Sequence, residues 1–282
     1  MSRIFEVPVD GGPYALAAGS DGAMWVTLVH RGAIARVAPD GGLEVYPVAE
    51  GARPSIIAAG PDGALWFTRA GDDRIGRIST RGELSAFELR SGSAPFGITA
   101  GPDRAMWFTA MGTGVVGRIG LDGTVTEEAA PGGAPSMITT GPDGALWFTL
   151  NQANAIGRLD RGEVTLRTIP TPRAGPVGIA GTHDDAVWFT AIQADKVGRI
   201  PMNEAMQELD LPGKPHAVVA DPAGGVWVSL WGADQIARVS ADGEAGLVDL
   251  PAGSEPHGMA IGPDGALWVA LEAGFVMRLP TV

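Results

Sequence analysis

The chain has 282 residues, of which 45% are hydrophobic and 18% are charged, a balance typical of a folded globular protein rather than a disordered one. Its 20 basic and 32 acidic residues give a net charge of −12, which argues against binding to nucleic acid or to an anionic membrane surface. The absence of cysteine excludes a disulfide framework, a thiol nucleophile and a thiolate metal site.

The first predicted element is a short strand, Ile4 to Val7, which has no partner in the residues that directly follow it. The stretch from Met1 to Glu6 lacks the apolar segment of a secretory signal, and no apolar run approaches the ~18 residues that span a bilayer. We therefore expect a soluble protein with a cytoplasmic location.

From Pro13 onward, the chain consists of seven copies of one sequence unit, each marked by three residues in fixed order. Successive tryptophans of the unit, 39 to 41 residues apart, are Trp25, Trp66, Trp107, Trp147, Trp188, Trp227 and Trp268. Each follows a proline by twelve residues: Pro13, Pro54, Pro95, Pro135, Pro176, Pro215 and Pro256. Ten or eleven residues after each tryptophan comes an arginine: Arg36, Arg77, Arg118, Arg158, Arg199, Arg238 and Arg278.

Each copy contains four short segments with the pattern of β-strands. In the second copy these segments are residues 56–59, 64–68, 75–78 and 84–89, and a Pro-Asp-Gly turn separates the first two. Gly and Pro recur too often for a sustained helix. Four strands per unit of about 40 residues are typical of a β-propeller blade. The sequence therefore predicts an all-β fold, a seven-bladed β-propeller that forms a single domain over residues 1–282.

The two ends of the chain predict how the ring closes. The last copy stops after its third strand, Val276 to Leu279, and the unpaired strand at the start is of the missing fourth type. We expect residues 3–9 to complete blade seven, which removes the exposed strand edges of an open ring.

Residues that recur in all or most copies are interpreted as structural. The tryptophans, the arginines and the threonines two positions after the tryptophans are expected to pack the blades or to link them by hydrogen bonds. The aspartate of each Pro-Asp-Gly turn is interpreted as a turn cap rather than a calcium ligand. His30 and His183 fall in loop and turn segments and are expected to be solvated surface residues.

Four residues in the last two copies depart from this pattern. The residue after the opening proline is histidine only in copies six and seven, at His216 and His257. The residue four positions past the tryptophan is charged only in copy seven, at Glu272, and Glu255 precedes the proline of that copy. Because a first strand begins where the second strand ends, all four side chains are expected at one rim, at the mouth of the central channel.

The chemistry of these residue types indicates a metal-assisted site. Two carboxylates without cysteine suit a hard cation such as Mg²⁺, and His257 suits general-base work. Tyr14, Phe96 and Trp231 are expected at the same rim, where aromatic side chains can hold a bulky, partly apolar ligand. From the residues alone, proton abstraction with elimination and hydrolysis both stay open.

Seven short segments and Glu272 together resemble the virginiamycin B lyase family, whose members inactivate type B streptogramin antibiotics. The segments are 12–14 (GPY), 94–98 (APFGI), 151–158 (NQANAIGR), 175–179 (GPVGI), 215–217 (PHA), 231–233 (WGA), 255–258 (EPHG) and Glu272. The set in the last two copies is specific, whereas the repeated blade motif is shared by many propellers.

The resemblance implies a carbon–oxygen lyase that linearises cyclic depsipeptides by elimination at the ester bond. It implies that His257 accepts the proton, that Glu255 and Glu272 hold Mg²⁺, and that His216 contacts the substrate. Tyr14 and Trp231 are expected to contact the substrate from the same rim. The expected partner is thus a small molecule, and the closed ring is expected to be a monomer. The alternatives are a metal-dependent lactone or ester hydrolase and a non-catalytic binding propeller.

Overall fold

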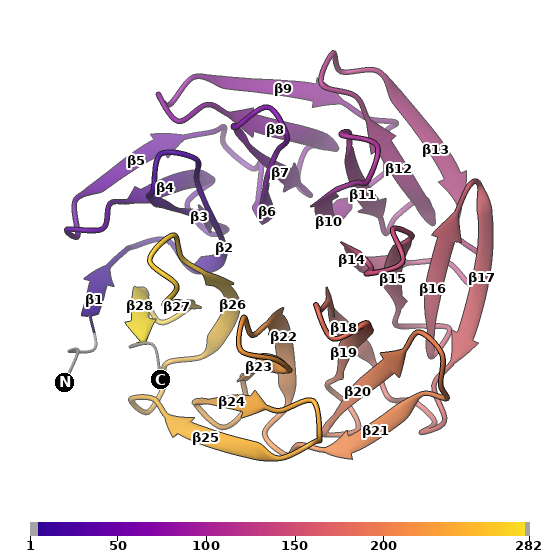
Figure 1. The fold of residues 1–282 in the computed structure, drawn as a ribbon. Coiled ribbons are helices and arrows are strands. Elements are labelled where there is room, and N and C mark those ends of the chain that lie inside the picture. Colours follow the sequence, from indigo (N-terminus) through magenta and orange to yellow (C-terminus); the bar gives the residue numbers. More distant parts are fainter. Residues whose placement is uncertain (1–4, 280–282) are drawn as a thin grey trace.

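The computed structural model describes residues 5–279, which form a closed ring of seven four-stranded antiparallel sheets (Figure 1). These residues contain twenty-eight strands and no helix, so none of them forms a helical membrane span. The predicted seven-bladed β-propeller is therefore confirmed.

The strands of the first four blades follow the order of the sequence repeats. Blade one contains β2 (Pro13–Ala18), β3 (Met24–Leu28), β4 (Ala33–Val37) and β5 (Leu43–Pro47). Blade two contains β6 (Pro54–Ala59), β7 (Leu65–Arg69), β8 (Arg74–Ile78) and β9 (Leu84–Glu88). Blade three contains β10 (Pro95–Ala100), β11 (Met106–Ala110), β12 (Val115–Ile119) and β13 (Val125–Ala129). Blade four contains β14 (Pro135–Thr140), β15 (Leu146–Leu150), β16 (Ala155–Asp160) and β17 (Glu163–Thr168).

The remaining blades keep this order, and the last one borrows a strand from the start of the chain. Blade five contains β18 (Pro176–Gly181), β19 (Ala186–Ala191), β20 (Lys196–Pro201) and β21 (Gln207–Asp210). Blade six contains β22 (Pro215–Ala220), β23 (Val226–Leu230), β24 (Gln235–Val239) and β25 (Ala245–Asp249). Blade seven contains β26 (Pro256–Ile261), β27 (Leu267–Leu271), β28 (Phe275–Leu279) and β1 (Phe5–Pro8).

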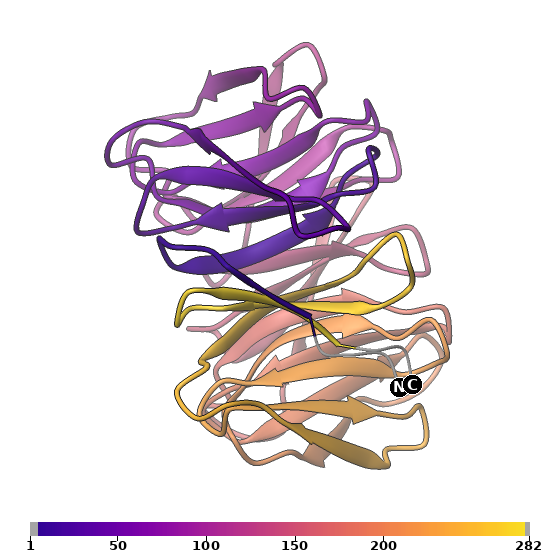
Figure 2. The same cartoon turned by 90° about the vertical axis from the view of Figure 1, so that its left-hand side faces the viewer.

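The closing strand β1 pairs antiparallel with β28, with Val7 opposite Val276. Seen from the side, these first and last strands lie together where the first and last blades meet (Figure 2). Val7 packs with Trp268 and Ala270 in the hydrophobic cluster that joins blade seven to blade one. The predicted closure is confirmed for the paired residues, while positions 3 and 4 of the predicted strand lie outside the described residues.

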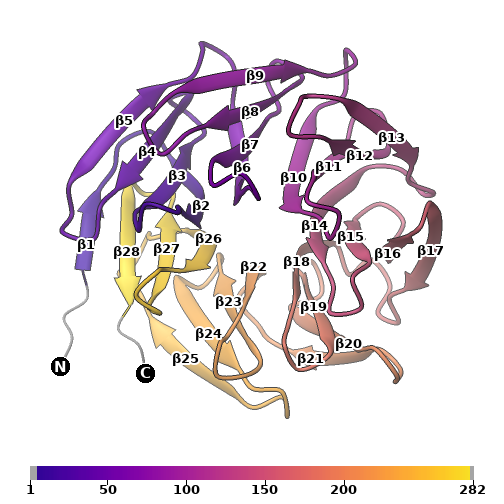
Figure 3. The ribbon, with the colours of Figure 1, turned by 45° about the horizontal axis from the view of Figure 1, so that its top comes forward.

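The first strand of every blade lies at the centre of the ring (Figure 3). Each of these strands contains a β-bulge directly after its proline. In blade seven, Pro256 pairs with Leu271 but Met259 pairs with Val269, so two residues, His257 and Gly258, lie opposite one. A bulge redirects the side chains next to it. The residue after each proline is therefore set apart from the regular strand pattern, and this is the position of His216 and His257.

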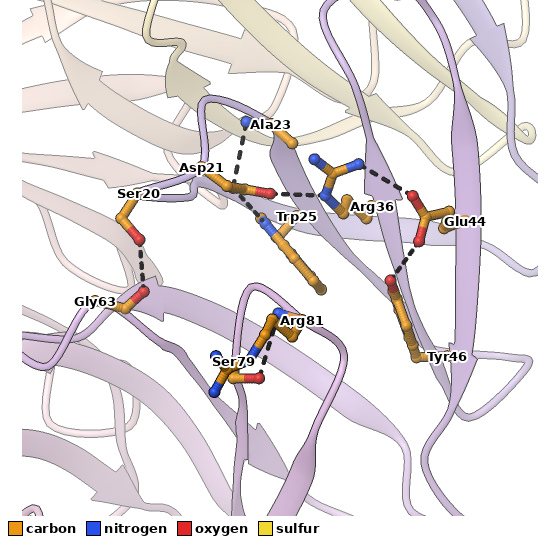
Figure 4. A network of polar contacts seen from close by, with 10 residues as sticks. All are labelled: Ser20, Asp21, Ala23, Trp25, Arg36, Glu44, Tyr46, Gly63, Ser79 and Arg81. Atoms are coloured by element: carbon orange, nitrogen blue, oxygen red, sulfur yellow. Dashed lines mark hydrogen bonds and ion pairs between the residues drawn. The ribbon is translucent and has the colours of Figure 1, made fainter.

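A repeated polar cluster fixes the turn between the first two strands, as Figure 4 shows for Asp21, Trp25 and Arg36 of blade one. In blade four, Asp143 caps the turn by accepting from the backbone N–H of Ala145 at 3.2 Å. The same carboxylate accepts from Trp147 Nε1 at 3.0 Å and from Arg158 Nε at 2.7 Å. The structural interpretation of the recurring aspartates, tryptophans and arginines is confirmed for these blades.

The recurring threonines link neighbouring blades as predicted. Thr149 Oγ1 accepts from the N–H of Met137 in its own blade and donates to the carbonyl of Val177 in the next blade, both at 3.0 Å. Thr68 forms the same link to the carbonyl of Phe96 at 2.7 Å. Blade seven has Ala270 at this position and so lacks the hydroxyl at the seam with blade one.

Candidate active site

The seven innermost strands surround a cavity of about 210 Å³ in the central channel. Its lining includes Tyr14, Phe96 and His216, together with aliphatic side chains from every blade. The wall is mostly apolar, so the few polar groups at its edge are well placed to orient a ligand.

His257 occupies the first position of the bulge in β26 and is 7% exposed. Its ring centroid lies 4.7 Å from that of His216, 4.8 Å from that of Tyr14 and 6.3 Å from that of Trp231. Its Nε2 atom is 2.5 Å from Glu272 Oε2. The imidazole is thus enclosed by three rings and contacts one carboxylate.

Glu272 directly follows β27, and its backbone N–H donates to the carbonyl of Glu255 at 3.1 Å. Glu255 lies just before β26, with an exposed side chain and a φ of 50°. The backbone pairing places both carboxylate-bearing residues at the same rim. The structure therefore brings the side chains of His216, His257 and Glu272 together and places Glu255 at the same rim through its backbone, with Tyr14, Phe96 and Trp231 around the same opening.

His30 and His183 are both exposed, as expected, but His30 also makes a contact that the sequence did not indicate. Its side chain is 65% exposed, and its Nε2 atom lies 2.8 Å from Glu272 Oε1. His30 belongs to the loop after β3, and blade one is next to blade seven, so the contact crosses the seam that closes the ring (Figures 1 and 3).

Burial keeps both site histidines neutral. Burial, reinforced by the neighbouring His257, lowers the pKa of His216 to about 4. Burial also lowers the pKa of His257 below its ordinary value of 6.5, although the carboxylate of Glu272 opposes this shift. Neutral imidazoles hold a free lone pair and can accept a proton.

The carboxylate of Glu272 has a lowered pKa. Burial alone raises it, but the hydrogen bond from His30 and the interactions with His257 outweigh burial, so the pKa falls below 4.5. The same carboxylate adds to burial in raising the pKa of Tyr14 to about 12. The site therefore combines an ionised carboxylate, two neutral imidazoles and a protonated phenol at neutral pH.

Glu255 and Glu272 are the two glutamates whose backbones pair at this rim. Within residues 5–279, no group of three or more His, Asp or Glu side chains is arranged to hold a metal ion. Mg²⁺ binds through one or two carboxylates and retains several waters, so Glu255 and Glu272 on paired backbones are compatible with it.

Comparison with known proteins gives consistent matches over the whole chain. Residues 2–279 match the virginiamycin B lyase family. A virginiamycin B lyase of Mycobacterium sp. strain KMS is 70% identical and covers 99% of this chain and 100% of the relative. One from Mycolicibacterium smegmatis is 72% identical with the same coverage.

Two solved structures have nearly the same backbone. A streptogramin B lyase aligns with a TM-score of 0.93 at 34% identity, covering 98% of this chain and 97% of the other. A virginiamycin B lyase from Staphylococcus aureus, in a catalytically inactive histidine-to-alanine form with quinupristin, aligns with a TM-score of 0.94 at 35% identity and covers 99% of both chains.

Proposed function

Because the chain belongs to the virginiamycin B lyase family, we propose that it is a lyase that inactivates type B streptogramin antibiotics by opening their ester-closed ring. The observation that carries the proposal is the contact between His257 and Glu272 at the mouth of an apolar channel. A buried base beside a cavity with aromatic walls is suited to a bulky, partly apolar substrate.

The proposed reaction is an elimination. His257 removes the α-proton of the residue whose side-chain oxygen forms the ester, and the electron pair of that bond forms a double bond between Cα and Cβ. The Cβ–O bond breaks, and its electrons leave with the carboxylate. No water is consumed, so the product is linear, unsaturated and equal in mass to the substrate.

The contacts of His257 indicate which ring nitrogen accepts the proton. With Glu272 ionised, Nε2–H donates to Oε2, and the lone pair lies on Nδ1. Nδ1 is buried and has no hydrogen-bond partner among the described residues. A substrate held against Tyr14 and His216 would supply that partner, and Glu272 would stabilise the imidazolium after proton transfer, as a carboxylate does for histidine in other enzymes.

We further propose that Glu255 and Glu272 hold Mg²⁺ at this rim and that His216, Tyr14 and Trp231 contact the substrate. When bound, Mg²⁺ supplies positive charge that stabilises the negative charge developing on the substrate. His216 is neutral at physiological pH, so it contributes a hydrogen bond rather than a charge.

Product mass tests the reaction type. The purified protein, incubated with a type B streptogramin and Mg²⁺, is expected to give a product of unchanged mass by mass spectrometry. A product heavier by one water would instead assign a hydrolase.

His257→Ala is expected to keep the wild-type circular dichroism spectrum and to lose turnover by about 10³-fold or more, the order of effect for removing a general base. Turnover near the wild-type rate would exclude His257 as the base.

Metal removal tests the cofactor. Exhaustive EDTA treatment is expected to stop turnover, and added Mg²⁺ is expected to restore it, because the carboxylates alone cannot neutralise developing negative charge. Glu255→Gln is expected to raise the Mg²⁺ concentration needed for half-maximal rate. Full activity after chelation would exclude the metal while leaving the elimination itself in place.

A further inference from the structure

His30 makes a contact that no other blade reproduces. It occupies the position five residues past the tryptophan, where the other blades have Gly71, Gly112, Gln152, Gln193, Gly232 and Ala273. It is thus the one ionisable side chain among these seven positions, and it lies beside the blade that contains Glu272. The contact joins residues 242 positions apart.

The backbone around His30 is tied to the segment that precedes blade one. The N–H groups of Val29 and His30 donate to the carbonyls of Gly12 and Gly11, both at 3.1 Å. Gly32 N–H donates to the Leu28 carbonyl at 3.0 Å and closes the loop. The imidazole therefore extends from an anchored loop, although the side chain itself is exposed.

Gly12 provides the space that the imidazole occupies. A Cβ at Gly12 would lie 2.2 Å from His30 Cδ2 and 3.0 Å from His30 Nε2. A Cβ at Gly175, the equivalent residue of blade five, would likewise clash with the side chain of Gln193. The position of His30 therefore depends on the absence of a side chain at Gly12.

The contact holds the carboxylate of Glu272 at both ends. Oε1 faces His30 and Oε2 faces His257, so the plane of the carboxylate is fixed between two imidazoles. Without His30, Oε1 loses its partner and the carboxylate can rotate away from His257. A rotated carboxylate no longer fixes the proton on His257 Nε2.

We propose that His30 is a positioning residue, which holds Glu272 across the ring seam so that Glu272 orients His257. The expected effect of His30 on the rate rests on the elimination proposed above. The orientation of His257 by Glu272 does not depend on which substrate is bound.

The kinetic test compares three single variants with the wild type at saturating Mg²⁺. His30→Ala is expected to lower kcat about tenfold, the order of effect of losing a hydrogen bond to a charged group, with KM within about twofold. His30→Gln is expected to recover most of kcat, since its amide can donate to Oε1. The matched control is Gln152→Ala, the equivalent position in blade four, which is expected to leave kcat and KM unchanged. A rise in KM with unchanged kcat would make His30 a substrate contact and overturn the proposal.

Gly12→Ala tests the same contact without altering His30. Ala94 and Ala134 occupy the equivalent position with φ of 43° and 47°, so the backbone accepts alanine there. The added methyl group is expected to displace the imidazole and to lower kcat as much as His30→Ala does. The double variant with Gly12→Ala and His30→Ala is expected to have the same kcat as either single variant. If the two fold-reductions in kcat multiply in the double variant, the two residues act independently and the proposal is overturned.

A spectroscopic test does not depend on turnover. The chain has four histidines, so long-range ¹H–¹⁵N spectra of the imidazoles resolve the proton position on each ring. His257 is expected to carry its proton on Nε2 in the wild type and to shift toward a tautomer mixture in His30→Ala but not in Gln152→Ala. Unchanged His257 nitrogen shifts in His30→Ala would overturn the proposal. If the wild type is inactive but the His257 tautomer still changes in His30→Ala, the proposed function is overturned and the positioning role of His30 stands.

Discussion

At the scale of single residues, the chemistry of the site depends on which side chains are charged. The pKa of His216 is about 4 and that of His257 lies below 6.5, so both imidazoles are neutral at neutral pH. Glu272, whose pKa lies below 4.5, is ionised under the same conditions. The site therefore combines neutral imidazoles, which can accept a proton, with one carboxylate charge, which would stabilise the imidazolium proposed to form at His257.

Tyr14 is expected to act as a hydrogen-bond donor over the whole working pH range. Its pKa, about 12, is raised, so the phenol keeps its proton well above neutral pH. Tyr14→Phe is expected to lower kcat/KM about tenfold, the effect of one lost hydrogen bond, by the same factor at pH 7 and pH 9.5. The measurement is steady-state kinetics at both pH values.

The matched control for this prediction is Tyr46→Phe, because Tyr46 is the other tyrosine of the chain and bonds to Glu44 on an outer strand. It is expected to leave kcat/KM unchanged. A Tyr14→Phe effect that disappears at pH 9.5 would mean that Tyr14 ionises in that range, contrary to its raised pKa.

Comparison of residues between repeats was enough to predict His216, Glu255, His257 and Glu272, because each differs from most of its counterparts at an aligned position. His30 differs from its counterparts too, and the same comparison would have found it. It was missed because a loop histidine with an exposed side chain has no local pattern that distinguishes it from a solvated one. Its role follows from a distance across the seam, which depends on ring closure.

At the scale of structural elements, the turn between the first two strands of blade four is stabilised by one carboxylate with several partners. Burial alone raises the pKa of Asp143, but hydrogen bonds from Trp147 and Arg158 outweigh it, and the pKa falls below 3.8. A carboxyl group with a lowered pKa stabilises the fold above its unfolded-state pKa, and this stability is lost as pH falls through the folded-state value.

Asp143→Asn is therefore expected to destabilise the protein in a pH-dependent way. The variant loses the ion pair with Arg158, which should cost about 1–2 kcal/mol at pH 7. The difference from the wild type should shrink as pH falls below about 3.8, because the wild-type carboxyl then becomes neutral as well. Urea unfolding at pH 7 and pH 3 measures both values.

Asp242→Asn, at an exposed position, is the control and should change stability by less than about 0.5 kcal/mol at either pH. A difference between Asp143→Asn and the wild type that is as large at pH 3 as at pH 7 would assign the effect to shape rather than to charge.

The strands themselves were predictable because turn residues separate short apolar segments at regular intervals. The bulge that follows every opening proline was not, because alternation of side chains along a strand does not report an extra residue. This local irregularity determines the direction of His257, so the sequence indicated the right residues but not how their side chains meet.

At the scale of the whole molecule, the fold was predictable because seven repeats constrain one another. A pattern seen once can be ambiguous, but the same proline, tryptophan and arginine at nearly constant spacing leave few alternatives to a ring of blades. The closing strand followed from the missing fourth strand of the last repeat.

Ring closure is expected to depend on the buried face of β1. Val7 is 5% exposed and packs in the cluster that includes Trp268. Val7→Asp is expected to destabilise the protein by about 3 kcal/mol, because it places an unpaired charge in that cluster. Differential scanning calorimetry should show a lower Tm, and turnover should fall because Glu272 and His30 lie at the same seam.

Glu6→Gln, on the exposed face of the same strand, is the control and is expected to leave Tm and turnover near wild type. A Tm of Val7→Asp equal to that of this control would mean that β1 contributes little to closure.

The seam also determines when the proposed catalytic cluster of Tyr14, His30, His257 and Glu272 can form during translation. Tyr14 and His30 emerge from the ribosome first, whereas His257 and Glu272 emerge almost last. A nascent polypeptide that stops before the seventh blade therefore has only half of this cluster and lacks the proposed base, so premature termination is expected to yield no partial catalyst. A circular permutant opened in the exposed segment at residues 131–132 would instead place all four residues in one uninterrupted stretch.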